Sequence, residues 1–188
     1  NWQTYKVTTS EKTAVAWNEA LKTDFQAHEH FIPNEKAAET LQKVGFGAAN
    51  THRHDGISRG TSTLVTLGKE RAHEIIITPQ AAHHFSFRKG SSTQSYPGSL
   101  MGGIALLRQT YLDGLWYENY GHQEEINNSL QAWNEMQSLP QIFEVGNKQE
   151  ALRASKVAQE FDKQYILVGK GDEYQRINEI KATNSPIV

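Results

Sequence analysis

Two histidines one residue apart form the densest group of chemistry-capable side chains in the chain. His52 and His54 lie in the stretch THRHDGISRG, residues 51–60. Alternate side chains of a strand point to the same side, so imidazoles at this spacing can bind one metal ion together. A metal site here would indicate a metal-dependent hydrolase, whereas a plain polar loop would place the function elsewhere.

A carboxylate and an amine hold comparable places later in the chain. Glu144 interrupts the apolar stretch QIFEV, residues 141–145. There it can bind a metal, act as a base or pair with a buried Arg or Lys. Lys170 follows the apolar stretch YILV, residues 165–168, between two glycines. That turn is similar to a glycine-rich phosphate turn but lacks the full pattern.

The elements that would position Glu144 and Lys170 alternate between strand and helix. Residues 141–145 and 165–168 predict strands, residues 148–161 and 172–183 predict helices, and residues 186–188 begin another strand. This βαβαβ order with right-handed crossovers predicts a parallel sheet, either open or closed into a barrel. Side chains beyond the carboxyl ends of the strands would then form the site.

The elements before His52 extend the same interpretation. Residues 34–44 predict a helix that Gly45 ends, and residues 46–50 predict a short buried strand. We expect this unit to be the αβ half of a βα repeat that leads into His52.

Between these units the sequence predicts a hairpin, a third strand and two helices. The hairpin strands are residues 63–67 and 74–78, the third strand is residues 81–87, and the helices are residues 100–115 and 123–136. Alternation along the third strand places His83 and Phe85 on one face and His84 on the other. Residues 1–33 are predicted to be extended and loop-rich, with a short helix at residues 13–21.

The composition fits one soluble domain of ordinary size. The chain has 188 residues, 37% of them hydrophobic, and a net charge of -2, which gives no indication of nucleic-acid binding. No apolar stretch approaches the roughly 18 residues that span a bilayer. Cysteine is absent, which excludes disulfides and thiol chemistry but does not choose between the cytoplasm and the periplasm.

The two ends of the sequence suggest a piece of a longer polypeptide. The chain begins at Asn1 without a methionine and stops at Pro186-Ile187-Val188, which predicts the start of a strand. An open piece of a barrel exposes two sheet edges with unpaired backbone groups. We therefore expect a homo-oligomer through these edges, or an edge covered by residues 1–33.

Several phrases of the sequence resemble one family. They are GFGAA at residues 45–49, DGISRGT at residues 55–61, SSTQSYPGSLMG at residues 91–102, and the tail at residues 139–188. Together they are similar to bacterial proteins of the amidohydrolase superfamily, in the imidazolonepropionase-related group. The similarity covers about three-quarters of the chain and rests on phrases rather than on one diagnostic motif.

This resemblance implies a fold and an activity. It implies a (β/α)₈ barrel, of which this chain is a partial, TIM-barrel-like fragment with parallel βα repeats. It also implies hydrolysis of C–N bonds in cyclic amides or related small molecules by water that a divalent metal such as zinc activates. In that superfamily the metal ligands are a His-x-His after strand 1, histidines after strands 5 and 6, and an Asp after strand 8.

The sequence departs from that ligand pattern. His52 and His54 follow a helix, a glycine and a strand, which suits barrel strand 2 better than strand 1. The strand-5 position would fall near Glu144, and the strand-6 position near Val168-Gly169 carries no histidine. Strand 8 would lie past Val188. The ligand set is therefore incomplete in either assignment.

Three hypotheses remain open. The first is a fragment of an active amidohydrolase-type enzyme. The second is a catalytically inactive amidohydrolase-like domain with a binding or structural role. The third is a phosphate-binding α/β domain that uses residues 169–171 and 91–95. The candidate residues are Glu144 and Asp55 for catalysis, Arg59, His54 and Lys170 for substrate binding, and His52 and His54 for metal.

Overall fold

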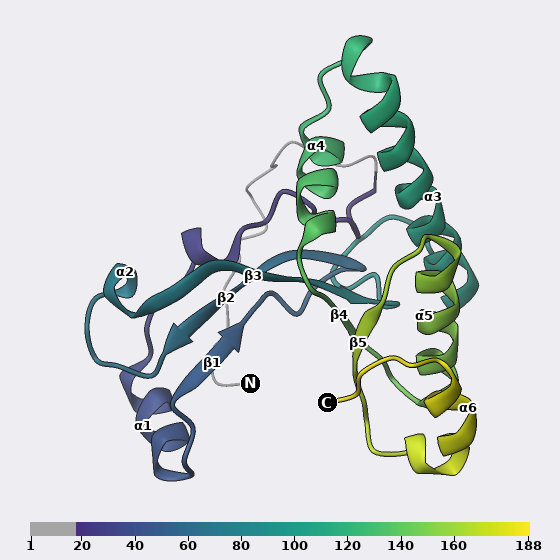
Figure 1. The fold of residues 1–188 in the computed structure, drawn as a ribbon. Helices are drawn as coiled ribbons and strands as arrows, with labels where there is room; N and C mark the ends of the chain where they lie inside the picture. The colour runs from purple at the N-terminus through teal and green to yellow at the C-terminus, as the bar shows by residue number, and fades with distance from the viewer. Residues whose placement is uncertain (1–17) are drawn as a thin grey trace.

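The structure, a computed structural model, describes residues 18–188 and combines one curled sheet with helices (Figure 1). The five strands lie in the order in which they occur along the chain. They are β1 (Ala48–Thr51), β2 (Ser58–Thr66), β3 (Ile76–Ser86), β4 (Gln141–Glu144) and β5 (Tyr165–Val168). The predicted α/β class is confirmed.

Helices and short 3-10 turns connect these strands. The helices are α1 (Glu35–Lys43), α2 (Ala72–Ile75), α3 (Leu100–Asn119), α4 (Asn128–Glu135), α5 (Lys148–Glu160) and α6 (Ile177–Ala182). The 3-10 turns are η1 (Ala27–Glu29), η2 (Gly121–Gln123), η3 (Met136–Ser138) and η4 (Glu173–Arg176). Side chains of asparagine and serine cap the major helices, and the caps are Asn34, Ser99, Asn127 and Asn147.

Parallel pairing is confined to one half of the sheet. β3, β4 and β5 are parallel, and a bridge from Leu167 to Ile187 continues the same pairing. β1 and β2 are antiparallel, as are β2 and β3. The expectation that helix, Gly45 and strand form half of a βα repeat is therefore wrong. The loop 52–57 is too short for a parallel crossover, which needs about a dozen residues, so the chain turns back.

The predicted hairpin exists, but its second strand is longer than expected. β2 and β3 pair along most of their length, and β3 joins the two strands predicted at residues 74–78 and 81–87. Pro79, which cannot donate a backbone hydrogen bond, lies where the register shifts, between the pairs Leu64–Thr78 and Ser62–Ala82.

The main core lies between the sheet and the helices α3 to α6. Phe85, Phe143 and Tyr165 project from β3, β4 and β5 into this core and contact one another, and Phe85 also contacts Trp133 of α4. Because side chains alternate along a strand, their neighbours point to the opposite face of the sheet. That opposite face carries His84, Ser86, Ile142, Glu144, Ile166 and Val168.

Two glycines of α3 allow neighbouring parts of the chain to pack closely against this helix. A Cβ at Gly103 would lie 3.1 Å from the carbonyl oxygen of Phe87, and one at Gly114 would lie 2.6 Å from Trp133. Ile104 and Tyr111 of α3 are buried, whereas Leu115 is 50% exposed.

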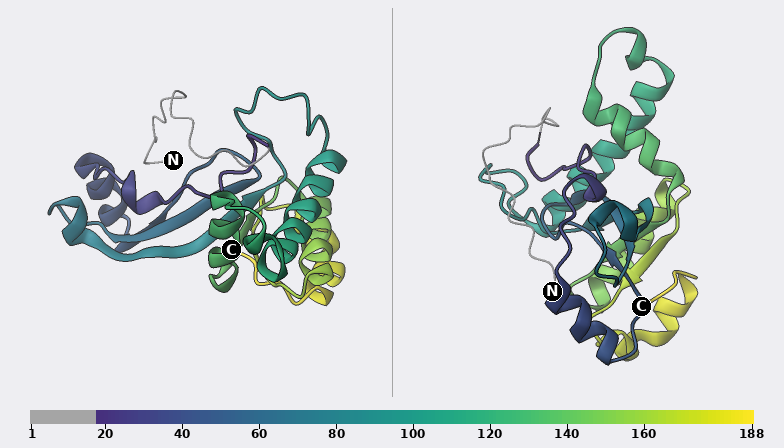
Figure 2. Two further views of the ribbon diagram at one scale, coloured as in Figure 1. Left: turned by 90° about the horizontal axis from the view of Figure 1, so that it is seen from above. Right: turned by 90° about the vertical axis from the view of Figure 1, so that its left-hand side faces the viewer.

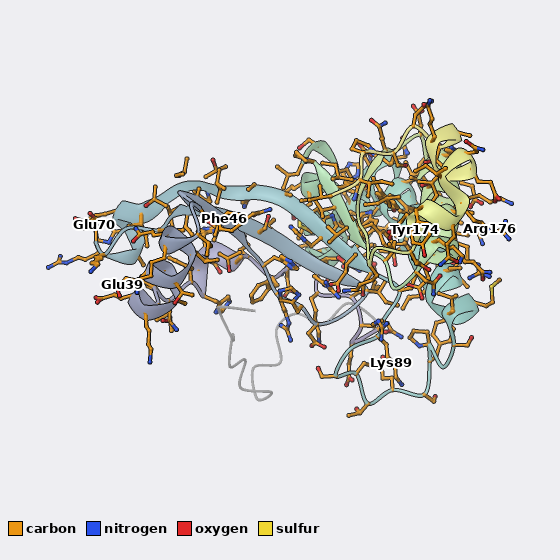
Figure 3. All side chains as sticks on the ribbon, turned by 90° about the horizontal axis from the view of Figure 1, so that it is seen from below. Glu39, Phe46, Glu70, Lys89, Tyr174 and Arg176 are labelled. Atoms are coloured by element: carbon orange, nitrogen blue, oxygen red, sulfur yellow. The ribbon has the colours of Figure 1, made fainter. Side chains whose placement is uncertain are left out.

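The far ends of β2 and β3, together with α1 and α2, form an arm that projects away from α3, α4, α5 and α6, as Figure 2 shows in two further views. Phe31, Val65 and Ile75 form a small second core in this arm. Figure 3 shows Glu39, Phe46 and Glu70 on the arm and Tyr174 and Arg176 at the opposite end of the molecule. In the part of the chain that the structure describes, no helix is long and apolar enough to cross a membrane.

Residues 18–33 run beside the part of β2 that β1 does not pair. β1 pairs with Thr63–Thr66, and bridges from Leu21 to Ser58 and from Gln26 to Thr61 cover the preceding stretch. Residues 18–33 therefore cover the part of the β2 edge that β1 leaves unpaired. Most of the helix predicted at residues 13–21 lies outside the described residues.

His83 gives the fold a testable pH dependence. Its ring lies 4.0 Å from that of Phe85, its Nε2 lies 2.9 Å from the Ser58 hydroxyl, and burial lowers its pKa to about 3. Unfolded His83 takes up a proton below about pH 6.5, whereas folded His83 stays neutral down to about pH 3. The contribution of neutral His83 to the free energy of unfolding is therefore fully present above about pH 6.5 and is lost as the pH falls from about 6.5 towards about 3.

The wild type should lose stability between about pH 7.5 and about pH 5, and His83 should account for about 2 kcal/mol of that loss. In His83→Gln the loss over the same pH range should therefore be about 2 kcal/mol smaller. Urea unfolding at both pH values measures this difference. His73→Gln, at an exposed position in α2, is the control and should leave the wild-type loss unchanged. An equal pH dependence in wild type and His83→Gln would show that His83 does not cause it.

Candidate functional site

Side chains in or directly after all five strands meet at one edge of the sheet. β1 runs in the same direction as β3, so the loop after β1 reaches the edge where β3, β4 and β5 end. β2 begins at that edge because it is antiparallel to both neighbours. The edge gathers His52 and His54 after β1, Arg59 in β2, His84 in β3, Glu144 in β4 and Lys170 after β5. This is the edge at which α/β sheets bind ligands.

Glu144 is the centre of this group. Its Oε2 accepts a hydrogen bond from Arg59 Nη1 at 2.6 Å, and its Oε1 accepts one from Lys170 Nζ at 3.2 Å. His54 Nδ1 lies 3.9 Å from Oε2. His54, Arg59 and Lys170 together hold the pKa of Glu144 well below its usual range, against partial burial, which raises it. Glu144 is therefore a carboxylate throughout the physiological range.

Arg59 is the buried member of this group. Its side chain is 4% exposed, compared with 30% for Glu144 and 51% for Lys170. Arg59 Nε also donates to the carbonyl oxygen of Gly56 at 3.3 Å, and the Ser86 hydroxyl donates to the same oxygen at 3.0 Å. The turn at Gly56 thus fixes the guanidinium against the carboxylate, while the Lys170 amine stays accessible.

Three imidazoles lie against each other beside Glu144. The rings of His52 and His84 are nearly parallel, with centroids 3.8 Å apart. The ring centroids of His52 and His54 are 4.2 Å apart. Burial and the neighbouring imidazole of His54 lower the pKa of His52 to about 4. Burial also lowers the pKa of His84 well below its usual value. His52 and His84 are therefore neutral near pH 7.

The metal site predicted from His52 and His54 does not fit this arrangement. The His52 ring stacks on that of His84, and the His54 ring lies against the His52 ring with a tilt of 44°. His52 Nδ1 lies 2.7 Å from the carbonyl oxygen of Arg53 and must donate to it. Within residues 18–188, no three His, Cys, Asp or Glu side chains are placed to hold a metal ion together. Arg59 and Lys170 also donate to the two oxygens of Glu144, so a metal ion on this carboxylate would lie beside two positive charges.

Asp55 turns away from Glu144 and holds a neighbouring loop. Its carboxylate accepts hydrogen bonds from the Ser91 amide at 2.6 Å, the Ser91 hydroxyl at 2.7 Å and Arg53 Nη2 at 3.0 Å. Burial raises the pKa of Asp55, but these donors outweigh it and the pKa lies below the usual value. A Cβ at Gly90 would lie 1.9 Å from Asp55 Oδ1, so only glycine fits beside this contact.

The polar loop and the glycine turn that could bind phosphate already hold carboxylates of the chain. Glu19 accepts hydrogen bonds from the amide and hydroxyl of Thr93 and the hydroxyl of Ser92. Glu173 accepts from the amides of Lys170 and Gly171, both at 2.8 Å. These donors are engaged within the chain, so the geometry offers little to the third hypothesis.

Sequence reasoning missed the role of His84 and the anchoring of Asp55. Alternation placed His84 on the face opposite Phe85, which is the face of Glu144, so a signal was present. The contact of Asp55 with Ser91 joins segments far apart in the chain, and no local pattern predicts it. Asn147 and Asp172 also follow strands. Asn147 caps α5, and Asp172 accepts a hydrogen bond from the Lys148 amide.

Comparison with known proteins bears on the fold. The sequence matches no protein-family model, and no curated protein is similar enough to count as a relative. The structure is similar to the crystal structure of an amidohydrolase from Thermotoga maritima MSB8, with a TM-score of 0.73 and 17% sequence identity. The similarity covers 91% of this chain and 50% of that chain, so this chain spans about half its length. The described residues therefore have an amidohydrolase-like fold, with the group around Glu144 at the strand ends.

Proposed function

We propose that this chain forms part of an amidohydrolase-type hydrolase that cleaves C–N bonds in cyclic amide-like substrates. The observation that carries the proposal is the group of Glu144, Arg59 and Lys170, with His54 beside it, at the strand ends of an amidohydrolase-like fold. The relation to the imidazolonepropionase group rests on the sequence phrases at residues 45–49, 55–61 and 91–102, and it belongs to this proposal.

The residues of the group suit the recognition of an amide. Lys170 has an accessible amine that can bind the carbonyl oxygen and the negative charge that develops on it. Glu144 stays ionised, so it can accept a hydrogen bond from a ring N–H but cannot serve as an acid near pH 7. Asp55 contributes by fixing the loop that contains Ser91.

A second candidate function is a catalytically inactive amidohydrolase-like domain with a binding or structural role. The donor geometry favours it, because the stacked imidazoles and the ion-paired Glu144 do not form the metal centre that the resemblance implies.

Ring opening of simple cyclic amides distinguishes the two functions. Purified protein is incubated with hydantoin and with dihydrouracil, and the open-chain products are followed by mass spectrometry, with added zinc and with a chelator. We expect products above the buffer background in both conditions. Absence of product with both amides would favour the inactive domain. Activity that requires zinc and disappears in His52→Ala would instead restore the predicted metal pair.

A further inference from the structure

His54 has the surroundings of a base rather than of a structural histidine. Its side chain is 53% exposed, so solvent and a ligand can reach the ring. Its Nδ1 lies 3.9 Å from Glu144 Oε2, and its ring lies against that of His52. One ring nitrogen therefore faces a carboxylate, and the other lies across the ring from it.

We propose that His54 is the general base of this site and that Glu144 is the positioning residue that selects its tautomer. The inference rests on the proposed hydrolysis for its substrate class. It differs from the earlier expectation for His54, which was metal or substrate binding.

The carboxylate determines which nitrogen of His54 carries the proton. An ionised carboxylate can only accept, so Glu144 favours the tautomer with the proton on Nδ1 and leaves the Nε2 lone pair available. The separation of 3.9 Å is longer than a direct hydrogen bond. Such contacts are often loose in a free enzyme and tighten with substrate, and one water can also bridge them.

The groups around His54 support this role. From β2, Arg59 holds Glu144 in its ionised form, and from the loop after β5, Lys170 binds the other carboxylate oxygen. His52 remains neutral, so it supports the ring without adding a positive charge beside it. The carboxylate of Glu144 then stabilises the imidazolium that forms when His54 accepts a proton.

The proposed step balances without a further reactant. Water attacks the amide carbonyl carbon, its oxygen forms the new C–O bond, and its proton passes to His54 Nε2. The carbonyl oxygen carries the negative charge and is bound by the Lys170 amine. As the carbonyl re-forms, the C–N bond breaks, and His54 returns the proton to the leaving nitrogen. The product is a single ring-opened molecule with a carboxylic acid at one end and an N–H group at the other, and His54 is regenerated.

The tautomer of His54 tests the proposal without any need for activity. Nitrogen-15 NMR of the 188-residue chain at a pH where His54 is neutral distinguishes a proton on Nδ1 from one on Nε2, and His54→Gln assigns the signal. We expect the Nδ1–H form in the wild type and a shift toward the Nε2–H form in Glu144→Gln. Glu144→Asp, which keeps the charge, should retain more of the wild-type form if Glu144→Gln folds poorly. A wild-type ring protonated on Nε2 would overturn the proposal.

Kinetics supply the second test. We expect His54→Gln to reduce kcat by about 100-fold or more, with KM little changed, for the cyclic amides and for the activated ester p-nitrophenyl acetate. His73→Gln, on the arm, is the control. If the protein hydrolyses the ester in a His54-dependent way but does not hydrolyse the amides, His54 is a general base and the proposed function is wrong. Equal ester rates in wild type and His54→Gln would reject the base.

Discussion

Replacing Glu144 with Gln should lower the free energy of unfolding by about 3 kcal/mol, because it leaves a buried guanidinium without its carboxylate. Arg59 is only 4% exposed, so water cannot replace the lost partner. Lys170 is half exposed and contributes little to this loss. Urea unfolding of wild type and Glu144→Gln measures the change.

Two further variants show whether the pair with Arg59 is the cause. We expect the double variant Arg59→Met/Glu144→Gln to be about 2 kcal/mol more stable than the sum of the single losses predicts. Glu160→Gln is the matched control, because it breaks the exposed pair of Arg108 and Glu160 and should cost less than about 1 kcal/mol. Simple additivity of the two single changes would contradict a coupled buried pair.

We expect Gly60→Ala to lower the free energy of unfolding by more than about 3 kcal/mol, because two penalties act together. Gly60 has a φ of +72°, a conformation that side chains disfavour. A Cβ there would also lie 2.1 Å from the carbonyl oxygen of Phe25, which is backbone and cannot rotate away. The change would separate residues 18–33 from β2, directly beside Arg59.

Gly171→Ala isolates the first of these penalties. Gly171 has a φ of +93°, but a Cβ there meets nothing within 4 Å. We expect this control to lose only about 1 kcal/mol in the same thermal or urea unfolding experiment. Equal losses at Gly60 and Gly171 would show that the contact with Phe25 does not constrain the chain.

The C-terminal half of the fold was predictable because its signals are local. Apolar strands of four residues alternate there with amphipathic helices, and β5 lies at the predicted residues 165–168. The N-terminal half was not, because its pairing depends on how the chain returns after His52. The length of the loop 52–57 contained that information, since a loop this short permits an antiparallel return but not a crossover.

The candidate site was predictable in its members more than in their contacts. Glu144 and Lys170 meet because both follow parallel strands, as the βαβ order indicates. Pairing of Glu144 with a buried Arg was one of the alternatives for an ionised residue in an apolar strand, and the structure shows that Arg59 is the partner. The stacking of His52 on His84 depends on the antiparallel return of β2, so spacing alone suggested a metal pair instead.

The turnover of cyclic amides by a Lys170 variant shows whether the group around Glu144 binds and activates the amide. Lys170 is half exposed, so its replacement should leave the fold intact. Hydantoin and dihydrouracil are assayed with wild type, Lys170→Met and Lys156→Met, the last on an exposed position of α5. We predict that Lys170→Met loses about 10-fold or more in kcat/KM while Lys156→Met retains the wild-type rate. Equal turnover by all three proteins would contradict the assignment of the site to this edge of the sheet.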